Sequence, residues 1–172
     1  STGSGVKAMT SAAANVTPIT LELGGKSPLI IFDDADVENA VSGIMFANFF
    51  STGQVCSNGT RVFVQRGILD RLQARLVERV AAITLGDPLD VATHMGPLVS
   101  AVQRETVLKY MEIGQKEGAE LLCGGHAADV PEFPDGYFVQ PTVFSNVTDE
   151  MTIAREEIFG PVVVATPFDE LD

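Results

Sequence analysis

Residues 29–36 read LIIFDDAD, and this stretch decides the fold class. The uninterrupted apolar run from Leu29 to Phe32 is typical of a strand that is buried on both faces of a parallel sheet. The aspartates that follow indicate a turn rather than a cation site, and Asp36 suits the N-cap of a helix. That helix would carry its apolar residues on one face, namely Val37, Val41, Ile44, Met45 and Phe49.

The alternation of strand and helix continues along the chain. Apolar runs predict three further strands, over residues 61–65, 119–123 and 137–144. Helical spacing predicts two further helices, over residues 68–83 and 100–117, and the polar residues 126–136 indicate a surface loop. Nearer the N-terminus, an alanine-rich segment predicts a helix over residues 8–15, and residues 19–23 are a short strand candidate. Strands joined by crossover helices indicate an α/β fold.

The composition is that of a globular protein with a strong negative charge. The 172 residues are 45% hydrophobic, and 23 acidic against 11 basic residues give a net charge of −12. This charge provides no surface for phosphate backbones or anionic lipid, so nucleic acids and membranes are disfavoured as partners. No apolar run reaches the length of a spanning helix, and no signal peptide pattern is present, so we expect a soluble protein.

Cysteine and histidine usage narrows the chemistry. Cys56 and Cys123 do not form a disulfide framework in a chain of this length, which predicts a reducing compartment and a cytoplasmic protein. Cys123 is interpreted as a packing residue. His94 and His126 lack the spacing of metal ligands relative to cysteine or carboxylate, so no metal site is predicted.

Three short segments contain residues suited to catalysis. Cys56 lies in GQVCSNGTR (residues 53–61), where glycines and small polar residues leave space beside a thiol. Glu22 lies in LELGGKSP (residues 21–28) and could act as a base. Taken singly, a lone cysteine is more often a buried small hydrophobic residue, and a lone glutamate a solvated carboxylate. The third segment, EEIFGPV (residues 156–162), gives the pattern its specificity.

These three segments, in this order, resemble the aldehyde dehydrogenase superfamily. The resemblance covers nearly the whole chain and implies the catalytic domain of that fold, with a parallel-type sheet, crossover helices and the tail of a Rossmann-like cofactor domain. It places the end of the dinucleotide-binding domain at residues 1–31 and an incomplete catalytic domain at residues 32–172. Because family members are much longer, we expect a middle segment that is inactive by itself.

The resemblance also implies the site residues. Cys56 corresponds to the nucleophile and Glu22 to the general base. Glu157 falls on the carboxylate that binds the nicotinamide ribose, and Phe159 on the ring beside the nicotinamide. The remaining cofactor-binding positions are Leu23, Gly24, Ser1 and Gly5, the last two matching a turn at a helix N-terminus that suits a pyrophosphate.

Thiol chemistry explains why such residues are needed. Attack by the Cys56 thiolate on an aldehyde gives a thiohemiacetal that can release hydride to NAD, with NADP as the other candidate cofactor. The resulting thioester would be hydrolysed by a water that Glu22 activates. The backbone N–H of Cys56 is a candidate donor to the developing oxyanion.

Four further segments, residues 45–50, 56–64, 96–100 and 149–153, resemble the betaine aldehyde dehydrogenase group of this superfamily. This implies oxidation of betaine aldehyde to glycine betaine, and it implies a homodimer or homotetramer. The trimethylaminobutyraldehyde dehydrogenases are similar in the same places.

Two other functions are weighed against this hypothesis. A noncatalytic protein that retains the fold for binding or structure would have no reason to keep Cys56, Glu22 and Glu157 together. An acyl-transferring relative that uses coenzyme A commonly lacks a base at the position of Glu22.

Overall fold

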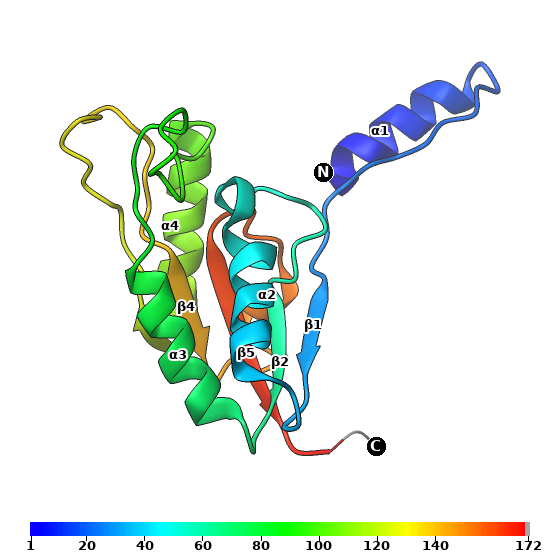
Figure 1. Ribbon diagram of the computed structural model, residues 1–172. Helices are drawn as coiled ribbons and strands as arrows, with labels where there is room; N and C mark the ends of the chain where they lie inside the picture. The colour runs from blue at the N-terminus through cyan, green and yellow to red at the C-terminus, as the bar shows by residue number, and fades with distance from the viewer. Residues whose placement is uncertain (171–172) are drawn as a thin grey trace.

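A five-stranded sheet forms the centre of the structure, a computed structural model that describes residues 1–170 (Figure 1). Its strands are β1 (Pro28–Ile31), β2 (Arg61–Gln65), β3 (Glu120–Cys123), β4 (Thr142–Ser145) and β5 (Val162–Phe168). They lie in the order β1-β2-β5-β4-β3. All neighbouring strands are parallel except β3, which pairs antiparallel with β4. The predicted α/β class with a parallel-type sheet is confirmed.

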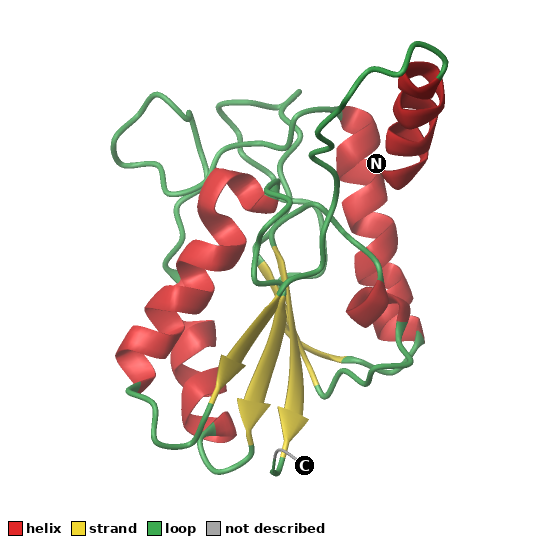
Figure 2. Cartoon of the chain, turned by 90° about the vertical axis from the view of Figure 1, so that its right-hand side faces the viewer, coloured by secondary structure: helices red, strands yellow, loops and turns green. Residues whose placement is uncertain are grey.

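Helices cover both faces of this sheet (Figure 2). On one face α2 (Val37–Phe49) packs against α3 (Leu69–Ala81), and on the other α4 (Ala101–Lys116) packs against the short α5 (Thr152–Arg155). A short 3-10 helix, η1 (Phe50–Gly53), follows α2 directly. The first helix, α1 (Thr2–Ala13), projects away from these layers (Figure 1). None of the helices in residues 1–170 has the length and apolar character needed to cross a membrane.

The strand β5 divides the hydrophobic core into two halves. Its residue Val163 packs with the residues of α2 and α3, whereas Val162 and Val164 pack with those of α4 and α5. Side chains alternate between the faces of a strand, and β5 lies between β2 and β4, so all three valines are fully buried. This strand was not predicted from the sequence, although its β-branched run carries the expected signal.

Several predicted boundaries agree with the structure because local capping determines them. Asp36 caps α2 by accepting a hydrogen bond of 2.8 Å from the backbone N–H of Asn39. Ser100 caps α4 in the same way, because its hydroxyl accepts a hydrogen bond of 3.2 Å from the backbone N–H of Gln103. The strand predicted at residues 61–65 coincides with β2.

Four predictions were wrong. The strand at residues 29–32 is not buried on both faces, because it forms the edge strand β1, and Ile30 and Phe32 are 50% and 41% exposed. The first helix begins at Thr2 rather than residue 8, because the Ser1 hydroxyl accepts a hydrogen bond from the N–H of Ser4 and caps it. Residues 19–23 form no strand, because no strand among residues 1–170 pairs with them. The sheet ends at β1. The strand expected over residues 137–144 is reduced to β4, which begins after Pro141, a residue without an N–H for pairing.

The domain boundary after residue 31 stays a prediction. The helix α1 and the segment that follows it lie apart from the layers in Figure 1. The strand β1, in contrast, already pairs with β2 from Pro28 onward.

Truncation of Phe144 tests the core packing. This side chain is fully buried on β4 against α4 and α5, so Phe144→Ala should lower the free energy of unfolding by about 3–5 kcal/mol through cavity formation. The matched control Val91→Ala removes a fully exposed side chain and should change it by less than about 0.5 kcal/mol. Urea unfolding followed by circular dichroism gives both values, and equal effects would contradict the packing described above.

Candidate functional site

The topology of the sheet brings the three sequence segments together. Residues 21–28 lead into β1, residues 53–61 into β2 and residues 156–162 into β5. These strands are neighbours and run parallel, so the three segments meet at the amino-terminal edge of the sheet. Ligands of open α/β sheets more often bind at the carboxyl ends of the strands, so the site has an unusual position.

An open cavity of about 550 Å³ lies at this edge. Glu22, Cys56 and Glu157 line it together, one from each segment. The other lining residues are Ser1, Leu23, Gly24, Gln54, Val55, Gln103 and Phe159. Of the positions named from the sequence, Gly5 alone is not in the lining. It is buried beneath Leu23, and an added Cβ would come within 2.9 Å of the Leu23 Cδ1 atom.

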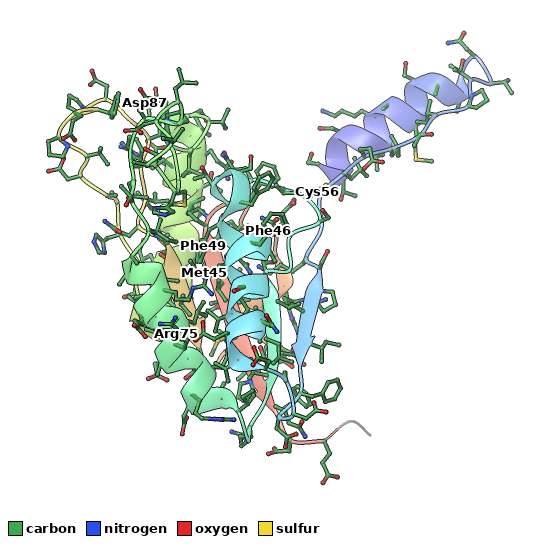
Figure 3. The ribbon with its side chains drawn as sticks, in the orientation of Figure 1. Met45, Phe46, Phe49, Cys56, Arg75 and Asp87 are labelled. Atoms are coloured by element: carbon green, nitrogen blue, oxygen red, sulfur yellow. The ribbon has the colours of Figure 1, made fainter. Side chains whose placement is uncertain are left out.

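Cys56 is exposed in the loop between η1 and β2, at the end of the body from which α1 projects (Figure 3). The buried amide of Asn48 supports this loop by donating hydrogen bonds to the carbonyl oxygens of Ile44, at 2.9 Å, and Gly59, at 3.2 Å. On the other side, Gly25 approaches so closely that a Cβ would lie 2.4 Å from the carbonyl oxygen of Cys56. The thiol is therefore presented to solvent by a loop that is anchored on two sides.

A tight turn connects α2 to the cysteine loop. Ser51, Thr52 and Gly53 follow one another in the left-handed region, with φ values of 52°, 56° and 70°. Two side-chain hydrogen bonds stabilise the turn. The Thr52 hydroxyl donates to the carbonyl oxygen of Gly96, and the side-chain oxygen of Gln54 accepts a hydrogen bond of 3.1 Å from the N–H of Val99. Such conformations cost about 1–3 kcal/mol each in residues other than glycine and cluster at functional sites.

Glu157 is cradled by the diglycine turn before β1. Its Oε1 atom accepts a hydrogen bond of 3.2 Å from the N–H of Gly25. A Cβ at position 24 would lie 2.0 Å from Oε2, so only glycine fits there without displacing the carboxylate. This contact joins the segment that contains Glu157 to the segment that contains Glu22.

The helix α4 holds the other side of the same segment. Gln103 donates from Nε2 to the carbonyl oxygens of Phe159, at 2.8 Å, and Ile158, at 3.2 Å. Further along α4, the Tyr110 hydroxyl donates a hydrogen bond of 2.7 Å to the Glu156 carboxylate. This hydrogen bond raises the pKa of Tyr110 to about 12. Phe159 has a φ of 55°, and these bonds hold it in that conformation at the cavity.

Sequence reasoning missed three of the lining residues. Gln54 and Val55 adjoin Cys56, and that adjacency was the available signal. Gln103 lies in the first turn of α4 and is far from all three segments in the sequence. It carried no local signal, because only the packing of α4 beside residues 156–160 brings its amide to the site.

Adding a methyl group at Gly53 tests the contact between the cysteine loop and the segment that contains Glu157. A Cβ there would lie 2.2 Å from the carbonyl oxygen of Gly160, so Gly53→Ala should destabilise the protein by about 1–3 kcal/mol. Gly43 on α2 has nothing within 4 Å, so Gly43→Ala is the matched control and should stabilise by about 0.5–1 kcal/mol. Thermal unfolding of the two variants should shift in opposite directions, and shifts of the same sign would contradict this geometry.

Alkylation tests the different environments of the two cysteines. Cys56 is exposed, whereas Cys123 is partly buried on β3, and that burial raises the pKa of its thiol. We therefore expect iodoacetamide at pH 7 to modify Cys56 several times faster than Cys123, because only the thiolate reacts and Cys123 ionises at higher pH. Peptide mass spectrometry over time measures both rates. Equal rates, or faster modification of Cys123, would refute the placement of Cys56.

Comparison with known proteins shows which family the chain resembles. The model of the aldehyde dehydrogenase family matches residues 1–172. The chain is 56% identical over 168 residues to a betaine aldehyde dehydrogenase of Brucella anthropi and 58% identical over 168 residues to one of Mesorhizobium japonicum. Each alignment covers 98% of this chain and 34% of the relative, so the chain spans about a third of the length of the curated relatives it matches.

Solved structures show the same fold. A betaine aldehyde dehydrogenase from Staphylococcus aureus in complex with NAD⁺ superimposes with a TM-score of 0.94 at 45% identity, over 98% of this chain and 33% of that chain. An NAD⁺ complex of aldehyde dehydrogenase from Bacillus cereus gives a TM-score of 0.93 at 49% identity, over 99% of this chain and 34% of that chain. This chain belongs to the aldehyde dehydrogenase family.

Proposed function

We propose that this chain provides the catalytic thiol, the general base and the nicotinamide side of the cofactor site in an NAD-dependent aldehyde dehydrogenase. The proposed reaction is the oxidation of betaine aldehyde to glycine betaine. The observation that carries the proposal is the meeting of Cys56, Glu22 and Glu157 in one cavity. The names of the similar proteins support the substrate, and they favour betaine aldehyde over trimethylaminobutyraldehyde.

Cys56 performs the first step. Its thiolate attacks the carbonyl carbon of the aldehyde and forms a carbon–sulfur bond, and the carbonyl oxygen becomes an oxyanion. In this mechanism the backbone N–H of Cys56 donates a hydrogen bond to that oxygen. The small residues around the thiol leave the space that a tetrahedral carbon requires, and solvent exposure of Cys56 gives the substrate access.

Glu22 performs the last step. Once the thiohemiacetal carbon has lost hydride, Cys56 holds the acyl group as a thioester. The exposed Glu22 carboxylate takes a proton from a water in the same cavity, and the hydroxide adds to the thioester carbon. The carbon–sulfur bond then breaks, which releases the acid and returns the thiolate. This base is the feature that favours hydrolysis over acyl transfer to coenzyme A.

The described residues fit a nicotinamide cofactor. The Gly25 N–H holds Glu157 through Oε1, so Oε2 could accept hydrogen bonds from the ribose hydroxyls. Phe159 is 36% exposed, so its ring could pack against the nicotinamide. Ser1 and the first turn of α1 offer N–H groups to the pyrophosphate. When bound, the nicotinamide accepts the hydride. Two of the similar solved structures contain NAD⁺, which favours NAD over NADP.

The assembly and location of the enzyme are part of the same proposal. Among residues 1–170, the edge strand β1 pairs with β2 alone and exposes Ile30, at 50%, which supports a homodimer or homotetramer. Both cysteines are free thiols, which supports a reducing, cytoplasmic location.

Substitution of the nucleophile and the base tests this mechanism in the full polypeptide that carries this sequence. Cys56→Ser should abolish NADH production from betaine aldehyde by several orders of magnitude. Glu22→Gln should lower kcat by about 10²–10⁴ while one equivalent of NADH still forms in a rapid burst, because thioester formation precedes the step that needs the base. Rapid-mixing absorbance at 340 nm measures both.

The matched control is Cys123→Ser, which removes a thiol on β3 away from the cavity and should retain full turnover. Undiminished turnover in Cys56→Ser would leave the noncatalytic interpretation as the better one.

A further inference from the structure

Lys26 follows the diglycine turn and has an unusual environment. Its Nζ atom is buried, and no residue among 1–170 accepts a hydrogen bond from it. An ammonium group without a partner is costly to bury, and proteins usually avoid it. The lysine therefore needs an explanation within the site itself.

Two charged groups act on this ammonium. Arg61 lies beside it, donating from Nε to the Lys26 carbonyl oxygen at 2.9 Å, and its positive charge opposes protonation of Lys26. Glu157 has the opposite effect, because its negative charge favours the protonated form. Burial is the largest influence and Arg61 adds to it, so the pKa of Lys26 is lowered to about 8 despite the opposing effect of Glu157. Of these influences only Glu157, which lines the cavity, favours the charged form of Lys26.

The position of Lys26 relative to Glu157 suggests a use for the buried charge. The turn formed by Gly24 and Gly25 is packed against the Glu157 carboxylate, with the Gly25 N–H as its donor. Lys26 is the next residue of that turn, and its ammonium is too far from Glu157 for an ion pair within 4.0 Å among the described residues. It can therefore attract the carboxylate without occupying the oxygens that a ligand would use.

We propose that Lys26 is a positioning residue whose buried ammonium attracts the Glu157 carboxylate and keeps it oriented against the diglycine turn, ready to bind the ribose hydroxyls of the cofactor. This inference rests on the proposed function. A methionine would fill the same space without the cost of burying a charge. Retaining a destabilising group is expected where binding requires it.

The stability of Lys26→Met provides a test that does not depend on activity. Between pH 8 and 10.5 the unfolded chain keeps a proton on Lys26 that the folded chain has lost, so the parent gains stability as pH rises through this window. Lys26→Met should be more stable than the parent at pH 7, and this advantage should shrink toward pH 10. A variant that is less stable at pH 7 would overturn the proposal, because the ammonium would then be a structural group with a stabilising partner.

Cofactor kinetics test the role itself in the full polypeptide. Lys26→Met should raise KM for NAD at pH 7 by about tenfold, with kcat nearly unchanged. In the parent, KM for NAD should rise above pH 8, whereas in Lys26→Met it should stay constant over that range. The control Lys109→Met removes an exposed ammonium on α4 and should leave KM unchanged.

A double-mutant cycle shows whether Lys26 acts through Glu157. If it does, Lys26→Met should add no further rise in KM once Glu157→Gln is present, because the carboxylate charge it acts on is already gone. Full additivity of the two changes, or an unchanged KM in Lys26→Met, would overturn the proposal. The proposed function would survive either result, since Cys56→Ser tests it separately.

Discussion

The parallel pairing of β1, β2 and β5 is the constraint on which the site depends. Each strand is preceded by one of the segments that line the cavity, so the segments meet only because these strands are adjacent and begin at the same edge. The pairing is stabilised by burial on both faces: β5 contributes valines to each half of the core, and α2, α3 and α4 cover the sheet. A strand order that separated β2 from β5 would also separate Cys56 from Glu157.

Close backbone contacts then determine the geometry at that edge. Gly24 and Gly25 lie against Glu157 and the Cys56 carbonyl, and Gly53 lies against Gly160, at distances that leave no room for a Cβ. These contacts link all three segments directly, so a shift of one segment displaces the others. The left-handed conformation of Phe159 is maintained from outside by the hydrogen bonds of Gln103. The site is therefore rigid on the side where we propose that the nicotinamide binds.

The electrostatics of the site involve a cost in stability. The buried ammonium of Lys26 has no hydrogen-bond acceptor among the described residues, and burial holds its pKa near 8. Glu157 receives one backbone hydrogen bond and the favourable field of that ammonium, and its second oxygen is not used by either. In our proposal, a carboxylate arranged in this way needs little reorganisation when it binds hydroxyl groups. The same arrangement makes cofactor affinity sensitive to the charge on Lys26 near pH 8.

The sequence by itself determined the local features and supplied the candidate reactive residues. Capping by Asp36 and Ser100, the strand at residues 61–65 and the helical spacing of α3 are all local, so propensity and periodicity were sufficient. Only the tertiary structure decided the strand order, the absence of a strand at residues 19–23 and the presence of Gln103 at the cavity. These depend on which distant segments become neighbours, and pairing partners across a sheet leave no signal in either segment alone.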